Sequence, residues 1–328
     1  MHTKMAAGVA VLAFAVAACG SSGSSSAPGG GASSGKTTSV TLGYVPYSDD
    51  AALFLAKDNG TFAKHGLNVS LVPAANPIAV ASSMLSGQEQ FGFITTPVLA
   101  NLNAKGTPIK CVSSVDGQQP SDPAHDSTML VAAKGSGITS INQLAGKKVA
   151  TVQLASLNSL ALEVLAKRNG IDPKSVQLIQ MPFPQMPAAL AQGHVQAAVI
   201  VSPFVNTAIA QGATVLTHPN AVLFGGATVT CLDATGSYIS QHPDVVAAFH
   251  AAMTEAITYA QSHQSQAKAT LAKYMSLPPA AAQKVILSTD WNPVLNPASI
   301  EQIEAYMKQF GQISKTVPAA TMIWSAGG

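Results

Sequence analysis

Positively charged side chains are scarce in this 328-residue chain. Arg168 is its only arginine, lysine and arginine together number 17, and charged residues make up 10% of the total. Proteins that bind nucleic acids neutralise phosphates with clustered lysine and arginine. The formal net charge is +2 and no long basic run occurs, so we expect no nucleic-acid partner.

Several motifs that carry catalysis or bind metals are also missing. The sequence has no G-x-G-x-x-G, H-E-x-x-H or C-x-x-C pattern, and its eight histidines show no ligand spacing. Residues 265–268 match S-x-x-K, but they lie in a polar helical stretch, and we interpret the match as chance. We therefore expect no catalytic residue, no metal and no cofactor.

Long apolar runs are absent apart from residues 5–18. That run is shorter than the roughly 20 residues of a bilayer span, follows Lys4 and ends in small residues, as signal peptides do. Cys19 comes directly afterwards and resembles the acylated cysteine of the bacterial lipobox. We expect a signal peptide at 1–18 and a flexible Ser/Gly-rich tether at 19–37. The alternative is an ordinary signal peptide followed by an incidental cysteine.

This N-terminus predicts an exported protein that is lipid-anchored to the outer face of the cell membrane, with the lipid as its only membrane contact. Removal of the signal peptide and acylation of Cys19 leave Cys111 and Cys231. Two cysteines in an exported protein can form a disulfide, although two buried free thiols remain the alternative.

Short β-branched runs alternate with longer Ala- and Leu-rich segments in the remaining chain. Segments 51–59 and 157–169 carry apolar residues at helical spacing. Strands that alternate with helices predict βαβ units and a largely parallel sheet. The runs that we expect to be strands are 40–45, 68–72, 91–95, 109–115, 148–152, 176–179 and 197–201.

The alternation is itself repeated. Residues 55–60 read LAKDNG and recur 110 residues later as LAKRNG at 165–170. Gly87, Gln90, Thr96, Pro97 and Gly106 recur as Gly193, Gln196, Ser202, Pro203 and Gly212, an offset of 106. Two ordered sets with nearly equal offsets predict two lobes of similar topology.

The order and spacing of these motifs resemble the substrate-binding proteins of ABC importers, in the group for sulfonates, taurine, nitrate and thiamine-pyrimidine precursors. The resemblance covers about residues 40–325. It rests on the motifs at 43–46, 55–67, 85–92, 138–149, 189–193, 202–203, 238–239 and 242–246.

The resemblance implies an α/β, periplasmic-binding-protein-like fold of type II, with two βαβ lobes joined by a two-segment hinge. Lobe 1 is then 38–119 plus 227–328 and lobe 2 is 128–217, with crossings at 120–127 and 218–226. In this topology a strand at 229–233 returns beside 109–115. That return would bring Cys111 and Cys231 together as a disulfide.

The ligand site of open α/β sheets lies beyond the carboxyl ends of the strands. The loops expected there are rich in hydroxyl, amide and aromatic side chains. Helix capping and core packing are the alternative roles for these residues. The candidate ligand-binding residues are Tyr44, Tyr47, Asn76, Thr95, Thr96, Gln153, Ser156, Asn158, Phe183, Ser202 and Phe204.

None of these loops contains a lysine or arginine, so an anionic ligand would have to be held by helix N-termini and neutral donors. Asp49, Asp50 and Asp116 lie in the same loops. They could pair with an amino or pyrimidine nitrogen of the ligand, but we expect them to be solvated.

The sequence thus predicts a monomeric solute-binding lipoprotein. It would capture a small organic or inorganic anion, or a heteroaromatic precursor, and deliver it to the permease of an ABC importer. One alternative is an enzyme similar to the fungal thiamine-pyrimidine synthases, whose cysteine-rich motif this chain lacks. Another is a sensory lipoprotein that works without a transporter.

Replacement of Cys19 by alanine should abolish acylation and release the protein from the membrane, because a lipid attached at this position is the only anchor expected. Fractionation of cells that express Cys19→Ala, followed by immunoblotting, measures the effect. A variant that stays entirely in the membrane fraction would contradict the lipoprotein hypothesis.

Overall fold

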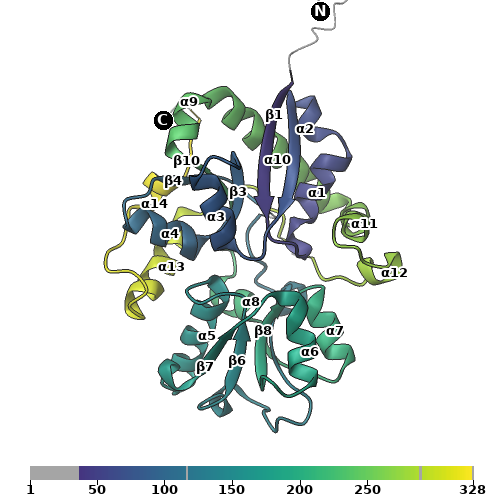
Figure 1. Ribbon diagram of the computed structural model, residues 1–328, viewed down its shortest axis with the longest axis vertical. Helices are drawn as coiled ribbons and strands as arrows, with labels where there is room; N and C mark the ends of the chain where they lie inside the picture. Colours follow the sequence, from purple (N-terminus) through teal and green to yellow (C-terminus); the bar gives the residue numbers. More distant parts are fainter. Residues whose placement is uncertain (1–36, 116, 288–289, 327–328) are drawn as a thin grey trace, which may run out of the picture. The chain divides into compact units, whose positions relative to one another are not determined.

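The computed structural model describes residues 37–115, 117–287 and 290–326 (Figure 1), all of which belong to one compact unit. The expected signal peptide, the tether with Cys19, and Asp116 lie outside the described residues. Within the described residues, no helix is long and apolar enough to cross a membrane.

The first lobe is built on a five-stranded sheet with the order β2-β1-β3-β10-β4. β1 runs parallel to β2 and β3, whereas β10 runs antiparallel to both β3 and β4. The strands are β1 (Thr38–Tyr44), β2 (Leu67–Pro73), β3 (Phe91–Thr95), β4 (Ile109–Ser114) and β10 (Thr230–Thr235).

The second lobe repeats this arrangement in the order β7-β6-β8-β5-β9, with β5 in the position of β10. β5 is antiparallel to β8 and β9, so each sheet is mixed, but four of its five strands run in the same direction, as expected for a largely parallel sheet. The strands are β5 (Thr128–Ala132), β6 (Lys148–Thr151), β7 (Gln177–Gln180), β8 (Ala197–Val201) and β9 (Thr214–Thr217).

The reversed strands have a topological cause. β5 and β10 are each the first strand that the chain enters after crossing from the other lobe, so they run against the strands that βαβ units connect. Helices connect most of the remaining strands. They are α1 (Ala51–Asp58), α2 (Thr61–Lys64), α3 (Pro77–Leu85), α4 (Thr96–Ala104), α5 (Leu157–Arg168), α6 (Met186–Ala191) and α7 (Phe204–Ala210).

After β10 the chain adds helices to the first lobe. The long α10 packs on α1, and its apolar residues at positions 246, 249, 253 and 257 lie on one face and are buried. Phe249 from this face stacks on Phe91 of β3, with ring centroids 3.8 Å apart. These helices are α9 (Gly236–Gln241), α10 (Pro243–Ser262), α11 (Gln264–Tyr274), α12 (Pro279–Ala282), α13 (Pro297–Gln309) and α14 (Ala319–Met322).

The repeated Asn-Gly pairs end equivalent helices. Asn59 is the C-cap of α1 and Asn169 that of α5, and the glycines that follow have φ values of 72° and 76°. A left-handed residue at this position favours glycine, which explains why this part of the repeat is retained in both lobes.

Two chain segments cross between the sheets. One joins β4 to β5 and the other joins β9 to β10, and the crossings expected at 120–127 and 218–226 fall within them. The second crossing contains a helix, α8 (Pro219–Phe224), where only a linker was expected. The two crossings pair with each other, since the Gln119 amide donates to the Ala227 carbonyl and the Gly226 amide donates to the Gln119 carbonyl, at 2.9 and 2.8 Å.

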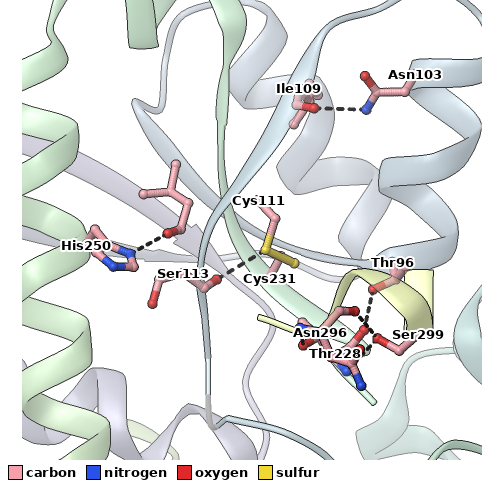
Figure 2. The surroundings of a disulfide bond; sticks show 11 residues. Thr96, Asn103, Ile109, Cys111, Ser113, Thr228, Cys231, His250, Asn296 and Ser299 are labelled. Atoms are coloured by element: carbon pink, nitrogen blue, oxygen red, sulfur yellow. Dashed lines mark hydrogen bonds between the residues drawn. A yellow bond between two sulfur atoms is a disulfide. The ribbon is translucent and has the colours of Figure 1, made fainter. Parts of the chain in front are cut away.

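A disulfide joins Cys111 of β4 to Cys231 of β10 (Figure 2), as the family topology implied. Their Cα atoms are 5.4 Å apart, and both residues are completely buried. The bond closes a loop between residues 120 apart in sequence, and this loop contains the whole sheet of the second lobe.

Removal of this cross-link should lower the free energy of unfolding by about 4 to 5 kcal/mol, because a loop of this length gains much chain entropy when it is opened. Urea unfolding of the Cys111→Ala/Cys231→Ala variant measures the loss. The reduced wild-type protein is the control, because it lacks the bond but keeps both side chains. If the variant and the oxidised wild-type protein differ by less than about 1 kcal/mol in free energy of unfolding, the disulfide does not constrain the unfolded chain.

Candidate ligand-binding site

A small cavity of about 30 Å³ lies between the lobes, at the strand ends that face the crossings. Val45 follows β1 and Val152 follows β6, so equivalent strand ends meet there, as expected for open α/β sheets. The antiparallel strands contribute their first residues, Thr230 of β10 and Thr128 of β5. The full lining is Val45, Tyr47, Asp49, Pro77, Thr95, Gln119, Thr128, Val152, Ser156, Leu157, Asn158, Phe183, Val201, Asn220, Val229 and Thr230.

The structure brings five of the candidate residues together in this lining. Tyr47 and Thr95 come from the first lobe, and Ser156, Asn158 and Phe183 come from the second. Ser156 is also the N-cap of α5, where its hydroxyl accepts a hydrogen bond from the Ser159 amide. Helix capping and a position in the pocket are therefore combined in one residue.

Three of the other candidates lie beside the pocket and hold its walls. The Asn76 side chain caps α3 by accepting from the Ala79 amide at 3.0 Å. The Gln153 side chain reaches across to the same helix and accepts from the Ile78 amide at 3.3 Å. Phe204 packs behind Phe183, with ring centroids 6.3 Å apart.

Tyr44, Thr96 and Ser202 also lie outside the lining. Tyr44 packs edge-on against Phe54, with ring centroids 5.3 Å apart. The Thr96 hydroxyl donates to the Thr228 carbonyl at 3.0 Å (Figure 2), and the Ser202 hydroxyl lies 2.9 Å from Asn206 Oδ1. The equivalent pair Thr96 and Ser202 therefore uses its hydroxyl groups within the protein.

Several lining residues were not among the candidates. Gln119, Thr128 and Asn220 belong to the crossings or lie next to them, and they form a chain of hydrogen bonds. Asn220 Nδ2 donates to Gln119 Oε1 at 3.1 Å and to Thr128 Oγ1 at 3.0 Å. The polar residues in the two crossings, such as Gln119 and Asn220, are the signal in the sequence that points to them.

Asp49 corrects an expectation. It lines the pocket and is only 3% exposed, and Asp50 beside it is completely buried, so neither carboxylate is solvated. Asp49 accepts hydrogen bonds from Ser48 Oγ at 3.2 Å and, across the lobes, from Ser127 Oγ at 2.9 Å. Asp50 accepts from the Tyr47 amide at 3.3 Å.

These carboxyl groups have raised pKa values because they are buried. Burial raises the pKa of Asp49 to about 6, although the hydrogen bonds from Ser127 and Ser48 oppose the shift. Burial also raises the pKa of Asp50 well above its ordinary value. Asp126 has a pKa of about 7 for the same main reason, opposed by the amides of Ala221 and Thr128.

Aromatic rings from both lobes meet at the pocket. The centroid of the Tyr47 ring lies 6.2 Å from that of Phe183, at an interplanar angle of 74°. Phe93 supports Tyr47 edge-on at 5.1 Å. Such rigid walls suit a flat or apolar part of a ligand.

The rim is held by hydrogen bonds between the lobes. The Ser48 amide donates to the Ser202 carbonyl at 3.1 Å, next to the bond from Ser127 to Asp49. Away from the pocket, at the C-terminal end of α5, Arg168 donates to the Tyr306 hydroxyl of α13 at 2.8 Å and adds a further contact between the lobes. The pocket is thus enclosed by contacts that would have to break for a ligand to enter.

Metal-ligating side chains do not gather at this pocket. Within the described parts of the chain, the one grouping with suitable spacing is Cys111, Cys231 and Asp233, which lies in the first sheet. Both sulfur atoms are joined in the disulfide, so the grouping offers a metal only the Asp233 carboxylate.

Comparison with known proteins places the chain in a family. The family model described as NMT1/THI5 like matches residues 48–267. The chain belongs to the NMT1/THI5-like family. The matched range includes the pocket lining from Asp49 to Thr230, so the family covers both halves of the candidate site.

Two curated relatives of this NMT1/THI5-like chain are, by name, a nitrate import protein and a periplasmic taurine-binding protein. The chain is 24% identical over 254 residues to the nitrate import ATP-binding protein NrtC of Synechocystis, which corresponds to 73% of the chain and 37% of that protein. It is 27% identical over 218 residues to the taurine-binding periplasmic protein of Escherichia coli, covering 65% and 64%. The chain thus spans less than two thirds of either relative.

A solved structure shows the fold. The periplasmic aliphatic sulphonate-binding protein SsuA of Escherichia coli superposes with a TM-score of 0.69 at 21% identity, over 88% of this NMT1/THI5-like chain and 92% of SsuA. The expected two-lobed, periplasmic-binding-protein-like α/β fold is confirmed.

The raised pKa values predict that the unliganded protein loses stability as the pH rises. The folded protein keeps protons on Asp49 and Asp126 up to about pH 6 and 7, whereas the unfolded chain releases them near pH 4. The folded state therefore binds more protons in this window, and the free energy of unfolding falls from about pH 4 to about pH 7.

Asp49→Asn should reduce this fall by about 3 kcal/mol, since its pKa shift spans about two units and each unit corresponds to 1.36 kcal/mol. Urea unfolding of the wild-type protein and the variant between pH 4 and 8 measures both slopes. Equal slopes would mean that Asp49 is already ionised in the folded protein at low pH.

Proposed function

We propose that this chain is an extracytoplasmic solute-binding protein that captures one small molecule between its lobes and delivers it to an ABC importer. The observation that carries the proposal is the enclosed pocket, which takes its lining in similar measure from two lobes joined by paired crossings. A ligand that touches both lobes stabilises the closed arrangement, because only there do all its partners reach it. A permease can then distinguish loaded from empty receptor.

The site of action proposed for the protein is the outer face of the cell membrane. The apolar run at 5–18 and Cys19 support export and lipid anchoring, and the Ser/Gly-rich tether would let the globular part reach a permease. The names of the nitrate- and taurine-related proteins support an uptake role. We propose a monomer, because one chain supplies the whole pocket lining.

For the ligand, the sequence left open small anions of the sulfonate, taurine or nitrate type and heteroaromatic precursors of the pyrimidine type. The pocket favours the heteroaromatic class. Tyr47 and Phe183 offer aromatic walls, and the part of the lining that the structure describes has no lysine, arginine or histidine. The residues proposed to touch the ligand are Tyr47, Asp49, Thr95, Ser156, Asn158, Phe183 and Asn220.

An enzymatic role of the pyrimidine-synthase type is the alternative. Such a role would need a nucleophile, a metal or an acid–base pair at the pocket, and among the described lining residues Asp49 is the one carboxylate. Residues 30–37 read GGASSGKT, which matches the P-loop pattern, and 31–35 match G-x-S-x-G. The element that follows both motifs is strand β1 rather than the helix that each requires, so neither match supports catalysis.

Neighbouring threonines give a matched test of the binding role. Thr95 lines the pocket and its buried hydroxyl has no partner, so Thr95→Val should remove a ligand contact and weaken binding by about 0.5 to 1.5 kcal/mol. Calorimetry with the best-binding compound from a thermal-shift panel of sulfonates, nitrate, aromatic acids and pyrimidines measures this. Stability without ligand should be unchanged or slightly higher.

Thr96→Val is the control, because the Thr96 hydroxyl already donates to the buried Thr228 carbonyl. It should destabilise the protein by about 1 kcal/mol and leave binding nearly intact. If binding is instead lost only in Thr96→Val, the ligand does not bind at the proposed site. Recovery of a chemically converted ligand after many turnovers would refute the binding-protein function itself.

A further inference from the structure

Asp49 is a buried carboxylate that lines the pocket, and no described residue forms an ion pair with it. Its two oxygens accept hydrogen bonds only from the hydroxyl groups of Ser48 and Ser127. The ion pairs of the described residues join Lys64 and His65 to Glu255, His125 to Asp122 and Lys273 to Asp58, and none involves Asp49. Buried carboxylates are normally paired with a positive charge, and the described residues supply none to Asp49.

The neighbouring charges make an anion an unsuitable partner. Asp50 is adjacent and completely buried, and Asp126, also completely buried, lies near enough for the charge of Asp49 to act on it. The described lining residues include no lysine, arginine or histidine that could offset a negative charge on Asp49. When Asp49 is ionised, it would repel an anionic ligand at short range in a site of low dielectric constant.

The unused polar atoms of the pocket point to the same conclusion. Asn220 donates both of its hydrogen bonds to Gln119 and Thr128, and its acceptor atom Oδ1 is buried without a partner. Thr95 Oγ1 is buried without a partner as well, and a hydroxyl group can accept. The pocket therefore offers acceptors at Asp49, Asn220 and Thr95.

Donors that could hold an anion are already occupied at two of the helices around the pocket. At the start of α3, the amides of Ile78 and Ala79 donate to Gln153 and Asn76. At the start of α4, the Thr96 amide donates to the Val229 carbonyl. These helix N-termini give a bound anion no free first-turn amide at those positions.

We infer, on the basis of the proposed function, that the ligand is a nitrogen base with a flat or apolar body, and that Asp49 accepts a hydrogen bond from its N–H group. Amines, amidines and amino-substituted aromatic rings have this chemistry. The aromatic rings of Tyr47 and Phe183 contact the body of the ligand, while Asn220 and Thr95 accept from further N–H groups. Sulfonates, nitrate and carboxylates have no N–H group to offer to Asp49 and should bind less tightly than such bases.

The test compares bases and acids that share a ring. Benzamidine is set against benzoate, benzylamine against benzenesulfonate, and tryptamine against indoleacetate, at equal concentrations in thermal-shift assays and calorimetry on the full globular protein. The bases should raise the melting temperature and the matched acids should not. This comparison uses the wild-type protein, so it stands even if a variant fails to fold.

Asp49→Asn should then weaken the best base at least tenfold, which corresponds to 1.4 kcal/mol, because the amide keeps the shape but loses the charge and offers one acceptor fewer. Asp50→Asn is the control: it makes the same substitution at an equally buried neighbour that does not line the pocket. The affinity of the Asp50→Asn variant for the same base should differ from that of the wild-type protein by less than threefold.

Three results would overturn the inference. Binding of the acids in preference to the bases would assign the site to anions, and the solute-binding function would stand. Unchanged affinity in Asp49→Asn would remove Asp49 from recognition. If neither bases nor acids bind, the ligand class is wrong and the proposed function loses its support as well.

Discussion

The hydrogen bond from Ser127 to Asp49 joins the two lobes at the edge of the pocket, and it places a carboxylate where water cannot solvate it. A buried carboxylate either acquires a proton or finds hydrogen-bond donors, because its charge is costly in a low-dielectric medium. The closed arrangement of this protein satisfies Asp49 with hydroxyl groups only. Enclosure of the pocket and the protonation of the Asp49 carboxyl group are therefore linked.

Asp126 extends this constraint to the crossings. Its two oxygens accept the Thr128 amide at the start of β5 and the Ala221 amide in α8, so one side chain fastens both segments that connect the lobes. The pairing of Gln119 with Gly226 and Ala227 adds backbone hydrogen bonds at the same place. Movement of the lobes would have to bend segments that are tied to each other, which favours a hinge in which both crossings move as one unit.

Local sequence patterns predicted much of the fold. The β-branched runs marked most strands, and the Asn-Gly pairs marked the ends of α1 and α5. Strands β5 and β9 were not identified, and the reversed direction of β5 and β10 was not foreseen. Strand direction depends on which lobe the chain comes from, and no local pattern of residues records that.

The site was harder to predict for a related reason. Thr95 and Thr96 are chemically alike and adjacent, yet one faces the pocket and the other bonds to the Thr228 carbonyl, as the alternation at a strand end dictates. Asp49 and Asp50 stand in a stretch that looks like an exposed polar loop, yet both are buried in the fold. Asp49 accepts a hydrogen bond from Ser127, 78 residues further along the chain, and a contact between such distant residues leaves no local signal in the sequence.

The disulfide has a consequence for the covalent integrity of the molecule. Cys111 and Cys231 enclose the whole sheet of the second lobe, so a protease that cuts once anywhere between them produces two fragments that stay linked. A single nick in an exposed loop of that lobe would leave the molecular mass unchanged, apart from the added water, until a reductant is supplied. One cleavage would therefore not release the second lobe.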